Sequence, residues 1–299
     1  MLEDLLSPES AARSPLRVFV VSFFLTWVAI VVSLSLFPDH ASVLVCAILA
    51  AFLAPFFFSL FASEGAKESQ TNGRNILSRH SSVIEIYGAF FLGSILAFSL
   101  AYVAFPKDLR AMTFAKQTEE IARLSTFLTG SAIRSDLARL IFANNTLVLL
   151  TTFLLSFLFG AGAALILGWN ASVIATYAGL YATSLAAKGY PELAAYAVGI
   201  PQALLSISMH GIPEIFGYFF AGLAGGILSA GLASNKQFRK ILVDALIFLG
   251  VGEFSIFVGA FIESGSGIFA LIAFIAYLVF VSVFVFSPTI EKQTGEFKL

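Results

Sequence analysis

Long apolar segments follow one another through most of the chain, and they restrict its fold more than any other feature. A helix that spans the hydrocarbon core of a bilayer needs about 20 apolar residues. Nine segments reach or approach that length: 17–37, 41–62, 83–105, 146–168, 171–187, 193–209, 213–233, 241–262 and 266–287. Only 12% of the residues are charged, whereas soluble domains carry about 25%. The sequence therefore predicts an all-α fold, a polytopic transmembrane helical bundle.

The first apolar segment has the features of a retained membrane helix. Arg13 and Arg17 precede it, it extends from Val18 to Phe37, and no small-residue cleavage motif follows. The single cysteine, Cys46, lies in the next apolar segment and is expected to be buried or to face lipid. The net charge of −1 gives no reason to expect a nucleic-acid partner.

Two polar connections interrupt the series of apolar segments. The connection 63–82 contains turn-forming and basic residues, and the connection 106–143 has apolar residues at helical spacing near 114–142. That pattern predicts an amphipathic helix interrupted near Gly130, either in the membrane interface or packed on the protein. We therefore expect a three-helix membrane segment at 1–105, an extramembrane connection at 106–143 and a membrane domain at 144–299.

Two similar tetrapeptides, GIPQ and GIPE, predict helix junctions. Proline favours the first turn of a helix and glycine often ends one. We expect junctions at Gly199, Pro201, Gly211 and Pro213. The helix between them would be roughly 14 Å long, about half of a hydrocarbon core. We therefore expect 193–212 to form a re-entrant or interfacial half helix, with about eight other segments spanning the membrane.

Eight spans place both termini on the same side of a cell membrane. The positive-inside rule favours cytoplasmic termini, because the short loops on that side hold most of the basic residues. Ten of the seventeen Lys and Arg residues would then be cytoplasmic: Arg13, Arg17, Lys67, Arg74, Arg79, Lys236, Arg239, Lys240, Lys292 and Lys298. The long 106–143 connection opposes this orientation.

Polar residues inside or beside spans are rare and usually functional. Five of them fall at one level of the eight-span arrangement: Asn144, Asn145, His210, Glu214 and Glu263. Glu253 precedes Glu263 by ten residues, so it lies about 15 Å deeper, near the midplane. It could carry protons or cations, or form a structural hydrogen bond with Ser255 or a neighbouring helix.

A helix junction accounts for the five polar residues without a ligand. Glu214 would lie at the positive end of a new helix, His210 could donate to Glu214, Glu263 or a carbonyl, and the asparagines would cap another helix start. A metal site is the alternative. The sequence lacks HExxH, a phosphate-binding loop and a nucleophile elbow. We therefore expect no catalytic residues, no metal and no cofactor.

Small residues recur at a spacing of four in 213–233. They are Gly217, Ala221 and Gly225, and in a second register Gly222 and Gly226. This spacing permits close helix contact. Packing within the chain and a homodimer interface both fit the pattern.

Three motifs resemble the stage II sporulation protein M family of prokaryotic membrane proteins. They are Asn144–Asn145 with the later GWNAS, HGIPE followed by FAGLAGG, and GAFIES with Glu263. The resemblance covers about 144–288 and implies a polytopic membrane protein with Asn144, Asn145, His210, Glu214 and Glu263 as its signature polar set. The founding members act in a membrane complex that remodels peptidoglycan during engulfment. That role is not carried over, because many relatives belong to organisms that do not sporulate.

Three functions remain in competition. The first is a non-enzymatic membrane scaffold or assembly component, whose partners would be the lipid bilayer and a second copy or another membrane protein. The second is a transporter or channel that uses Glu214, Glu253 and Glu263. The third is a metal-dependent intramembrane hydrolase with a His/Glu site.

Overall fold

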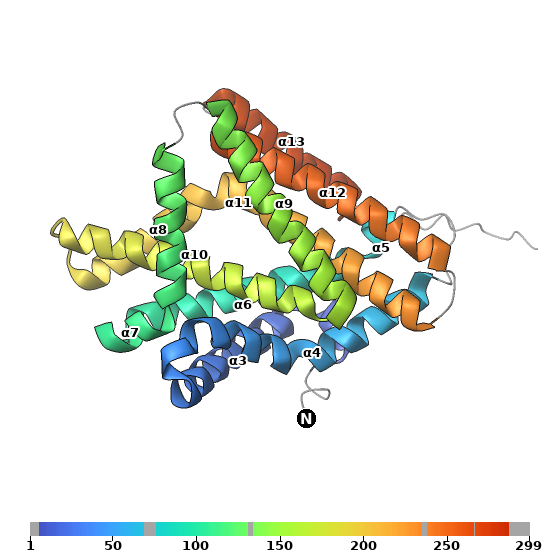
Figure 1. Ribbon diagram of the computed structural model, residues 1–299, viewed down its shortest axis with the longest axis horizontal. Helices are drawn as coiled ribbons and strands as arrows, with labels where there is room; N and C mark the ends of the chain where they lie inside the picture. Colours follow the sequence, from blue (N-terminus) through green and yellow to red (C-terminus); the bar gives the residue numbers. More distant parts are fainter. Residues whose placement is uncertain (1–5, 69–75, 131–133, 235–237, 266, 287–299) are drawn as a thin grey trace, which may run out of the picture.

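The computed structural model is an all-α bundle (Figure 1). It describes residues 6–68, 76–130, 134–234, 238–265 and 267–286, and these residues include no β-strand. The first helices are α2 (Pro8–Arg13), α3 (Pro15–Leu36), η1 (Pro38–His40), α4 (Ala41–Glu68), α5 (Ile76–Arg79) and α6 (Ser81–Ala104). The others are α7 (Lys107–Thr113), α8 (Ala115–Gly130), α9 (Arg134–Phe159), α10 (Gly162–Ala187), α11 (Glu192–Ser234), α12 (Phe238–Ser264) and α13 (Ile268–Phe284).

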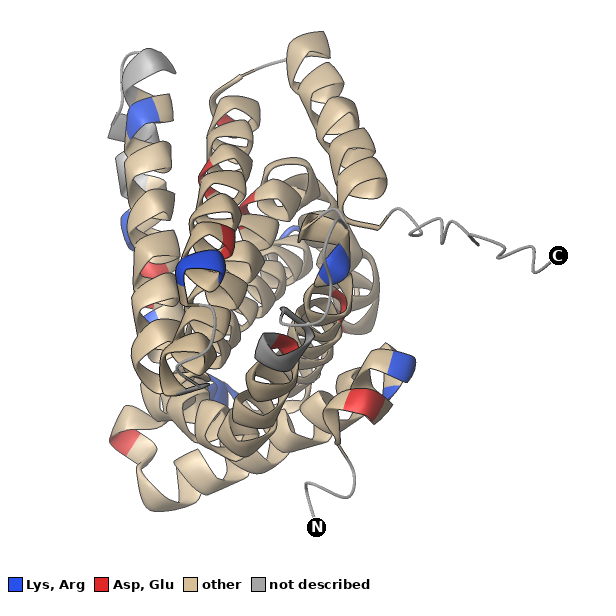
Figure 2. Ribbon diagram, turned by 90° about the vertical axis from the view of Figure 1, so that its right-hand side faces the viewer, with Lys and Arg blue, Asp and Glu red and all other residues tan. Residues whose placement is uncertain are grey.

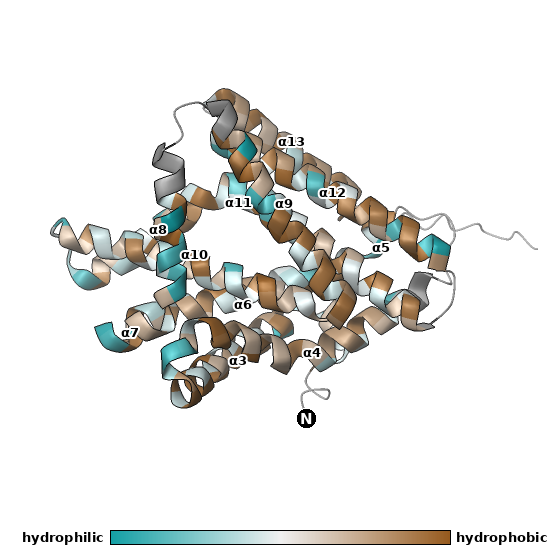
Figure 3. Cartoon of the chain, viewed as in Figure 1, coloured by the Kyte–Doolittle hydropathy of each residue, from teal (hydrophilic) through white to brown (hydrophobic). Residues whose placement is uncertain are grey.

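The predicted fold class is confirmed. In the described part of the chain, seven helices are long and apolar enough to cross a membrane: α3, α4, α6, α9, α10, α11 and α12. Helix α13 is also apolar but has only 17 residues. Charged residues are sparse along the ribbon, and apolar residues dominate the long helices (Figures 2 and 3). This distribution suits a bilayer, where lipid surrounds the outer helix faces.

The boundary between α9 and α10 differs from the hydropathy prediction. The sequence suggested spans at 146–168 and 171–187, but the chain turns at Gly160, whose φ is +63°. Glycine adopts this backbone conformation without the steric cost that a Cβ brings. Helix α9 also begins ten residues before Asn144, so Asn144 and Asn145 lie inside a helix and do not cap its start.

Helix α11 corrects the predicted junctions. It is one helix of 43 residues with Pro201 and Pro213 inside it, and Gly199 and Gly211 also lie within its bounds. The helix changes direction along its length (Figure 1), and internal prolines are a usual cause of such bends. Membrane helices tolerate proline where neighbouring groups compensate for the lost hydrogen bond. The expected short helix at 193–212 is therefore the first part of a longer helix.

The predicted amphipathic connection forms parts of three helices. Helices α7 and α8 supply most of it, and α9 already begins at Arg134. Helix α8 lies crosswise to α10 (Figure 1). Gln117 attaches α8 to the bundle, because its buried side-chain amide donates to the Ser42 carbonyl at 2.7 Å and to Ser172 Oγ at 3.0 Å.

The core is built around α11, which packs against α4, α6, α9, α10 and α12. The aromatic rings of Phe57, Tyr87 and Phe219 stack in sequence, with ring centroids 5.4 and 5.6 Å apart. These rings come from α4, α6 and α11, so helices before and after the 106–143 connection share one core.

Candidate functional site

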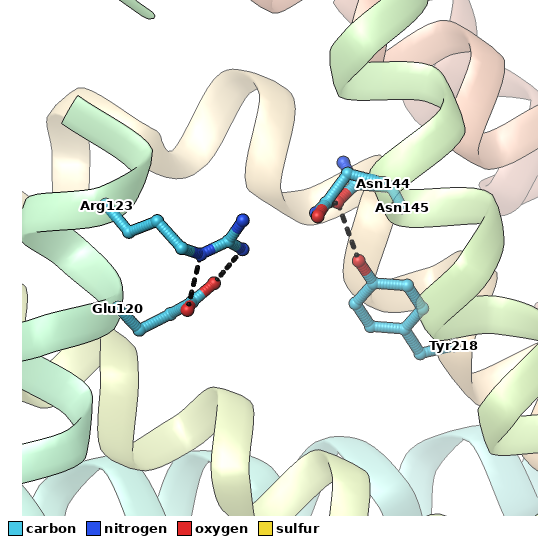
Figure 4. Close-up of polar contacts among 5 residues, drawn as sticks. All are labelled: Glu120, Arg123, Asn144, Asn145 and Tyr218. Carbon is cyan, nitrogen blue, oxygen red and sulfur yellow. Dashed lines mark hydrogen bonds and ion pairs between the residues drawn. The ribbon is translucent and has the colours of Figure 1, made fainter. Parts of the chain in front are cut away.

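A hydrogen bond between α9 and α11 lies at the centre of the candidate site. Tyr218 Oη donates to Asn145 Oδ1 at 3.1 Å, and Asn144 Nδ2 donates to the same oxygen at 3.2 Å (Figure 4). Tyr218 and Asn145 are buried, whereas Asn144 is exposed. Sequence reasoning missed Tyr218. The available signal was its position four residues after Glu214, which places both on one face of a helix.

The Glu214 carboxylate lies next to this pair. The Asn145 side chain hydrogen-bonds to it, and the Glu263 carboxylate acts on it electrostatically. Its Oε1 atom is buried and has no hydrogen-bond partner among the described residues. A Cβ built on Gly259 of α12 would lie 2.6 Å from Glu214 Cγ, so the absent side chain at position 259 makes room for this carboxylate.

His210 belongs to the same face of α11 but not to the hydrogen-bonded group. Because α11 is continuous, His210, Glu214 and Tyr218 are spaced by one turn each. The imidazole is partly buried and makes no hydrogen bond with the described residues. Of the five predicted residues, Asn144 and Asn145 share a hydrogen bond, and Asn145 and Glu263 both lie close enough to the Glu214 carboxyl to influence it.

Glu253 has a structural partner on a neighbouring helix. Thr146 Oγ1 on α9 donates to Glu253 Oε1 on α12 at 2.6 Å, and both side chains are partly buried. A hydrogen bond between Glu253 and a neighbouring helix was one of the alternatives in the sequence analysis. Ser255 instead accepts a bond from Tyr277 of α13 at 3.0 Å.

The small residues of α11 face several helices of the same chain. A Cβ at Gly217 would lie 2.8 Å from Ile256, and one at Gly222 would lie 2.6 Å from Ala163. Similar additions at Gly225 and Gly226 would overlap the Phe153 backbone and the Phe61 ring. Ala221 is fully buried. These residues therefore serve close packing within the chain.

A second buried polar group lies toward the other end of α12, and sequence analysis did not predict it. His80 Nδ1 and Glu64 Oε2 are 2.7 Å apart, and both side chains are almost completely buried. Arg79 approaches Asp244 at 4.0 Å. Asp244 and Glu263 are 19 residues apart on α12, about 28 Å along the axis, so the two polar groups are well separated.

Figure 4 also draws a charged pair on α8, Glu120 and Arg123, which is separate from the Asn145–Tyr218 pair. Arg123 Nε donates to Glu120 Oε2 at 2.9 Å, and this bond holds the pKa of the Glu120 carboxyl below its usual range. The pair lies beside the buried Gln117 on α8, with Glu120 partly buried and Arg123 exposed.

The donor set does not assemble a metal site. No group of three or more His, Cys, Asp and Glu side chains able to hold a metal ion occurs in the described ranges. The site offers instead a buried carboxylate, an amide, a phenol and a second carboxylate. This chemistry suits hydrogen bonding and proton binding.

The long apolar helices and the polar group among them define a multi-pass membrane protein of the α-helical class. The family model described as stage II sporulation protein M matches residues 18–265, so the chain belongs to this family. The match also covers most of the first 140 residues, where the sequence motifs had given little resemblance. The chain matches no curated protein and no solved structure.

Proposed function

We propose that this protein is a non-enzymatic membrane scaffold or assembly component that needs no resident cofactor. One observation carries the proposal. The hairpin formed by the end of α10 and the start of α11 extends beyond α8 (Figure 1), and it exposes large apolar side chains. Leu193, Val198 and Leu205 are 81%, 43% and 71% exposed.

Helix α11 is long enough for its first half to project from the bundle as part of the hairpin. Its 43 residues correspond to about 65 Å of helix, roughly twice a hydrocarbon core. Its second half is surrounded by other helices, since nearly all residues from Gly217 to Leu228 are buried. The first half therefore extends past the embedded bundle, and its exposed side chains are available to another protein.

The exposed apolar residues lie on one side of α11. Leu193, Ala197, Pro201 and Leu205 follow each other every four residues, and all four are exposed. Such a stripe is the pattern by which an amphipathic helix packs against a partner. The partner of this stripe would be an apolar helix face or groove of another membrane protein.

Site-specific photocrosslinking in native membranes tests this proposal. A photoreactive residue at Leu193 or Leu205 should form a discrete protein adduct. The same residue at Leu96 of α6, which is 42% exposed, should give lipid adducts only. The double variant Leu193→Ser/Leu205→Ser should remove the adduct from a crosslinker placed at Val198. Lipid adducts alone at all three hairpin positions would oppose a scaffold role for this surface.

A homodimer is one form that such an assembly could take. The glycines of α11 are engaged inside the chain, so a dimer would use a different face, and the α10–α11 hairpin is the surface we propose for it. Crosslinked adducts of twice the chain mass would identify a second copy as the partner.

We propose eight membrane crossings with both termini in the cytoplasm. Helix α13, at 17 residues, meets the lower limit of about 17 for a span. Cysteine labelling tests the orientation, because the only native cysteine, Cys46, is buried and can be replaced by serine. A cysteine at Lys188 should react with an impermeant maleimide added outside intact cells, whereas one at Arg239 should react only after permeabilisation. The reverse pattern would invert the topology.

Transport is the second candidate, and the unpartnered Glu214 Oε1 favours it. A buried carboxylate oxygen without a donor is a common feature of proton and cation pathways. Proteoliposome flux of protons or cations that is lost in Glu214→Gln but retained in Glu85→Gln would support transport. Absence of flux with an intact, reconstituted protein would leave the scaffold as the remaining proposal.

A further inference from the structure

We propose that Glu214 is a proton-binding site, which carries a bound proton on Oε1 at neutral pH while the nearby Glu263 keeps its negative charge. The proposal goes beyond the scaffold function, which does not depend on it. The ligand is a proton, and the Glu214–Glu263 pair then has a net charge of −1.

The surroundings of Oε1 suit a protonated oxygen. This atom is buried without a hydrogen-bond partner in the part of the chain that the structure describes. It lies 3.2 Å from the position that a Cβ on Gly259 would occupy, and the His210 carbonyl oxygen lies 3.1 Å from the same position. An ionised oxygen here would be desolvated without compensation, whereas an O–H is neutral.

The hydrogen bonds of Asn145 fix the other half of the carboxyl group. Asn145 Oδ1 accepts from Tyr218 and from Asn144, so its acceptor side is occupied. Only its NH2 group can donate to Glu214. Oε1 is given no donor by the described residues. That environment matches the hydroxyl oxygen of a carboxylic acid, which carries the proton.

The charges around Glu214 favour the same state. The Glu263 carboxylate faces it from α12 and repels a second negative charge. On α11 the other titratable groups of this face are His210 and Tyr218. Asn144, Asn145 and Thr146 of α9 are uncharged. Helices α10 and α13 also contact α11, and neither contains a charged residue. No Lys or Arg in the described residues forms an ion pair with Glu214.

A proton fits this site better than a metal cation. Asn145 directs a donor to Glu214, and a donor repels a cation. The described residues also provide no third carboxylate or imidazole that would complete a metal-ion group. The Glu253 carboxylate has its own hydrogen-bond donor, Thr146. It therefore serves as the matched control for Glu214.

Infrared spectroscopy of the full chain in nanodiscs tests the proposal. At neutral pH the wild-type protein should show a carboxylic-acid C=O band that shifts in D2O. Glu214→Gln should remove this band, and Glu253→Gln should leave it unchanged. A wild-type protein without the band, or a band that persists in Glu214→Gln, would overturn the proposal.

A second variant keeps the test decisive if Glu214→Gln does not fold. Glu263→Gln removes the neighbouring negative charge, so the proton should bind Glu214 about tenfold more weakly and the band should disappear about one pH unit lower. If the band of Glu263→Gln disappears at the same pH as that of the wild type, the two carboxyl groups do not interact. That result would overturn the proposed Glu214–Glu263 pair. These readouts detect a bound proton without flux, so they are independent of the scaffold and transport tests.

Discussion

Tyr218 of α11 donates a 3.1 Å hydrogen bond to Asn145 of α9, and both side chains are buried. The bond joins two of the four helices that carry the family motifs. A buried amide that loses one donor is left partly unsatisfied, and such losses are costly because water cannot replace the donor.

Tyr218→Phe should therefore lower the free energy of unfolding by about 0.5–1.5 kcal/mol, the usual contribution of one hydrogen bond. Thermal unfolding in a mild detergent would measure the change. Asn145→Ala should cost more, since the carbonyl of that amide accepts two bonds and its NH2 group faces Glu214. Strictly additive effects in the double variant would contradict a direct interaction.

Gly225 and Gly250 differ in the space around their α-carbons, so alanine should have opposite effects at the two positions. At Gly225 of α11 an added Cβ would overlap the backbone of Phe153 and Phe157 on α9, whereas at Gly250 of α12 it would meet nothing within 4 Å. Gly225→Ala should destabilise the protein by about 1–3 kcal/mol. Gly250→Ala should be neutral or stabilising by up to about 1 kcal/mol, because alanine favours helix. Equal melting temperatures for the two variants would show that α9 and α11 are not in contact at Gly225.

The sequence predicted the fold class and the polar residues because both depend on composition and helical spacing. The length of an apolar segment identifies a membrane span. The position of each residue along its span placed Asn145, Glu214 and Glu263 at the same depth in the membrane. Tyr218 and Thr146 were missed, since tyrosine and threonine are common in apolar helices and only their partners on other helices distinguish them.

Other errors came from local rules that the surroundings override. Proline suggested helix starts within α11, but the buried helix continues through Pro201 and Pro213. Hydropathy extended the span beyond Phe159, because Gly160, Ala161 and Gly162 are neither charged nor strongly polar although they form the turn. The His80–Glu64 pair joins the end of α4 to the start of α6, and periodicity within one helix contains no information about such a pair.

The contact between α9 and α12 depends on Thr146. Its hydroxyl donates to Glu253 at 2.6 Å, and Thr146→Val preserves the shape of the side chain while it removes the donor. The loss should destabilise the protein by about 1–3 kcal/mol, because the acceptor is a partly buried carboxylate. Thr151 supplies the control, since its hydroxyl bonds to the Leu147 carbonyl of its own helix. If Thr146→Val and Thr151→Val melt at the same temperature, the inter-helix bond contributes nothing to stability.

The buried hydrogen-bonded pair of His80 and Glu64 should be the most sensitive polar contact. Glu64→Ala removes one hydrogen-bond partner of a fully buried imidazole, and breaking a buried pair typically costs about 3–5 kcal/mol. Glu64→Gln should recover part of this loss, since the amide oxygen can still accept from the ring. Exposed Glu85 of α6 gives the comparison, and Glu85→Ala should change stability by less than about 0.5 kcal/mol. A Glu64→Ala variant as stable as Glu85→Ala would mean that the pair does not hold α4 and α6 together.

The stability of a Gly211 variant tests whether α11 is continuous. In a continuous helix Gly211 has helical dihedrals and free space around it, so Gly211→Ala should stabilise the protein by about 0.5–1 kcal/mol through the lower entropy of the unfolded chain. At a helix junction, glycine would instead supply a left-handed turn, and alanine would cost about 1–2 kcal/mol. Gly189 in the α10–α11 turn is the reference for that case, since its φ is +98° and no atom would obstruct a Cβ. Gly211→Ala should thus raise the melting temperature while Gly189→Ala lowers it, and a fall in both would restore the broken helix that the sequence suggested.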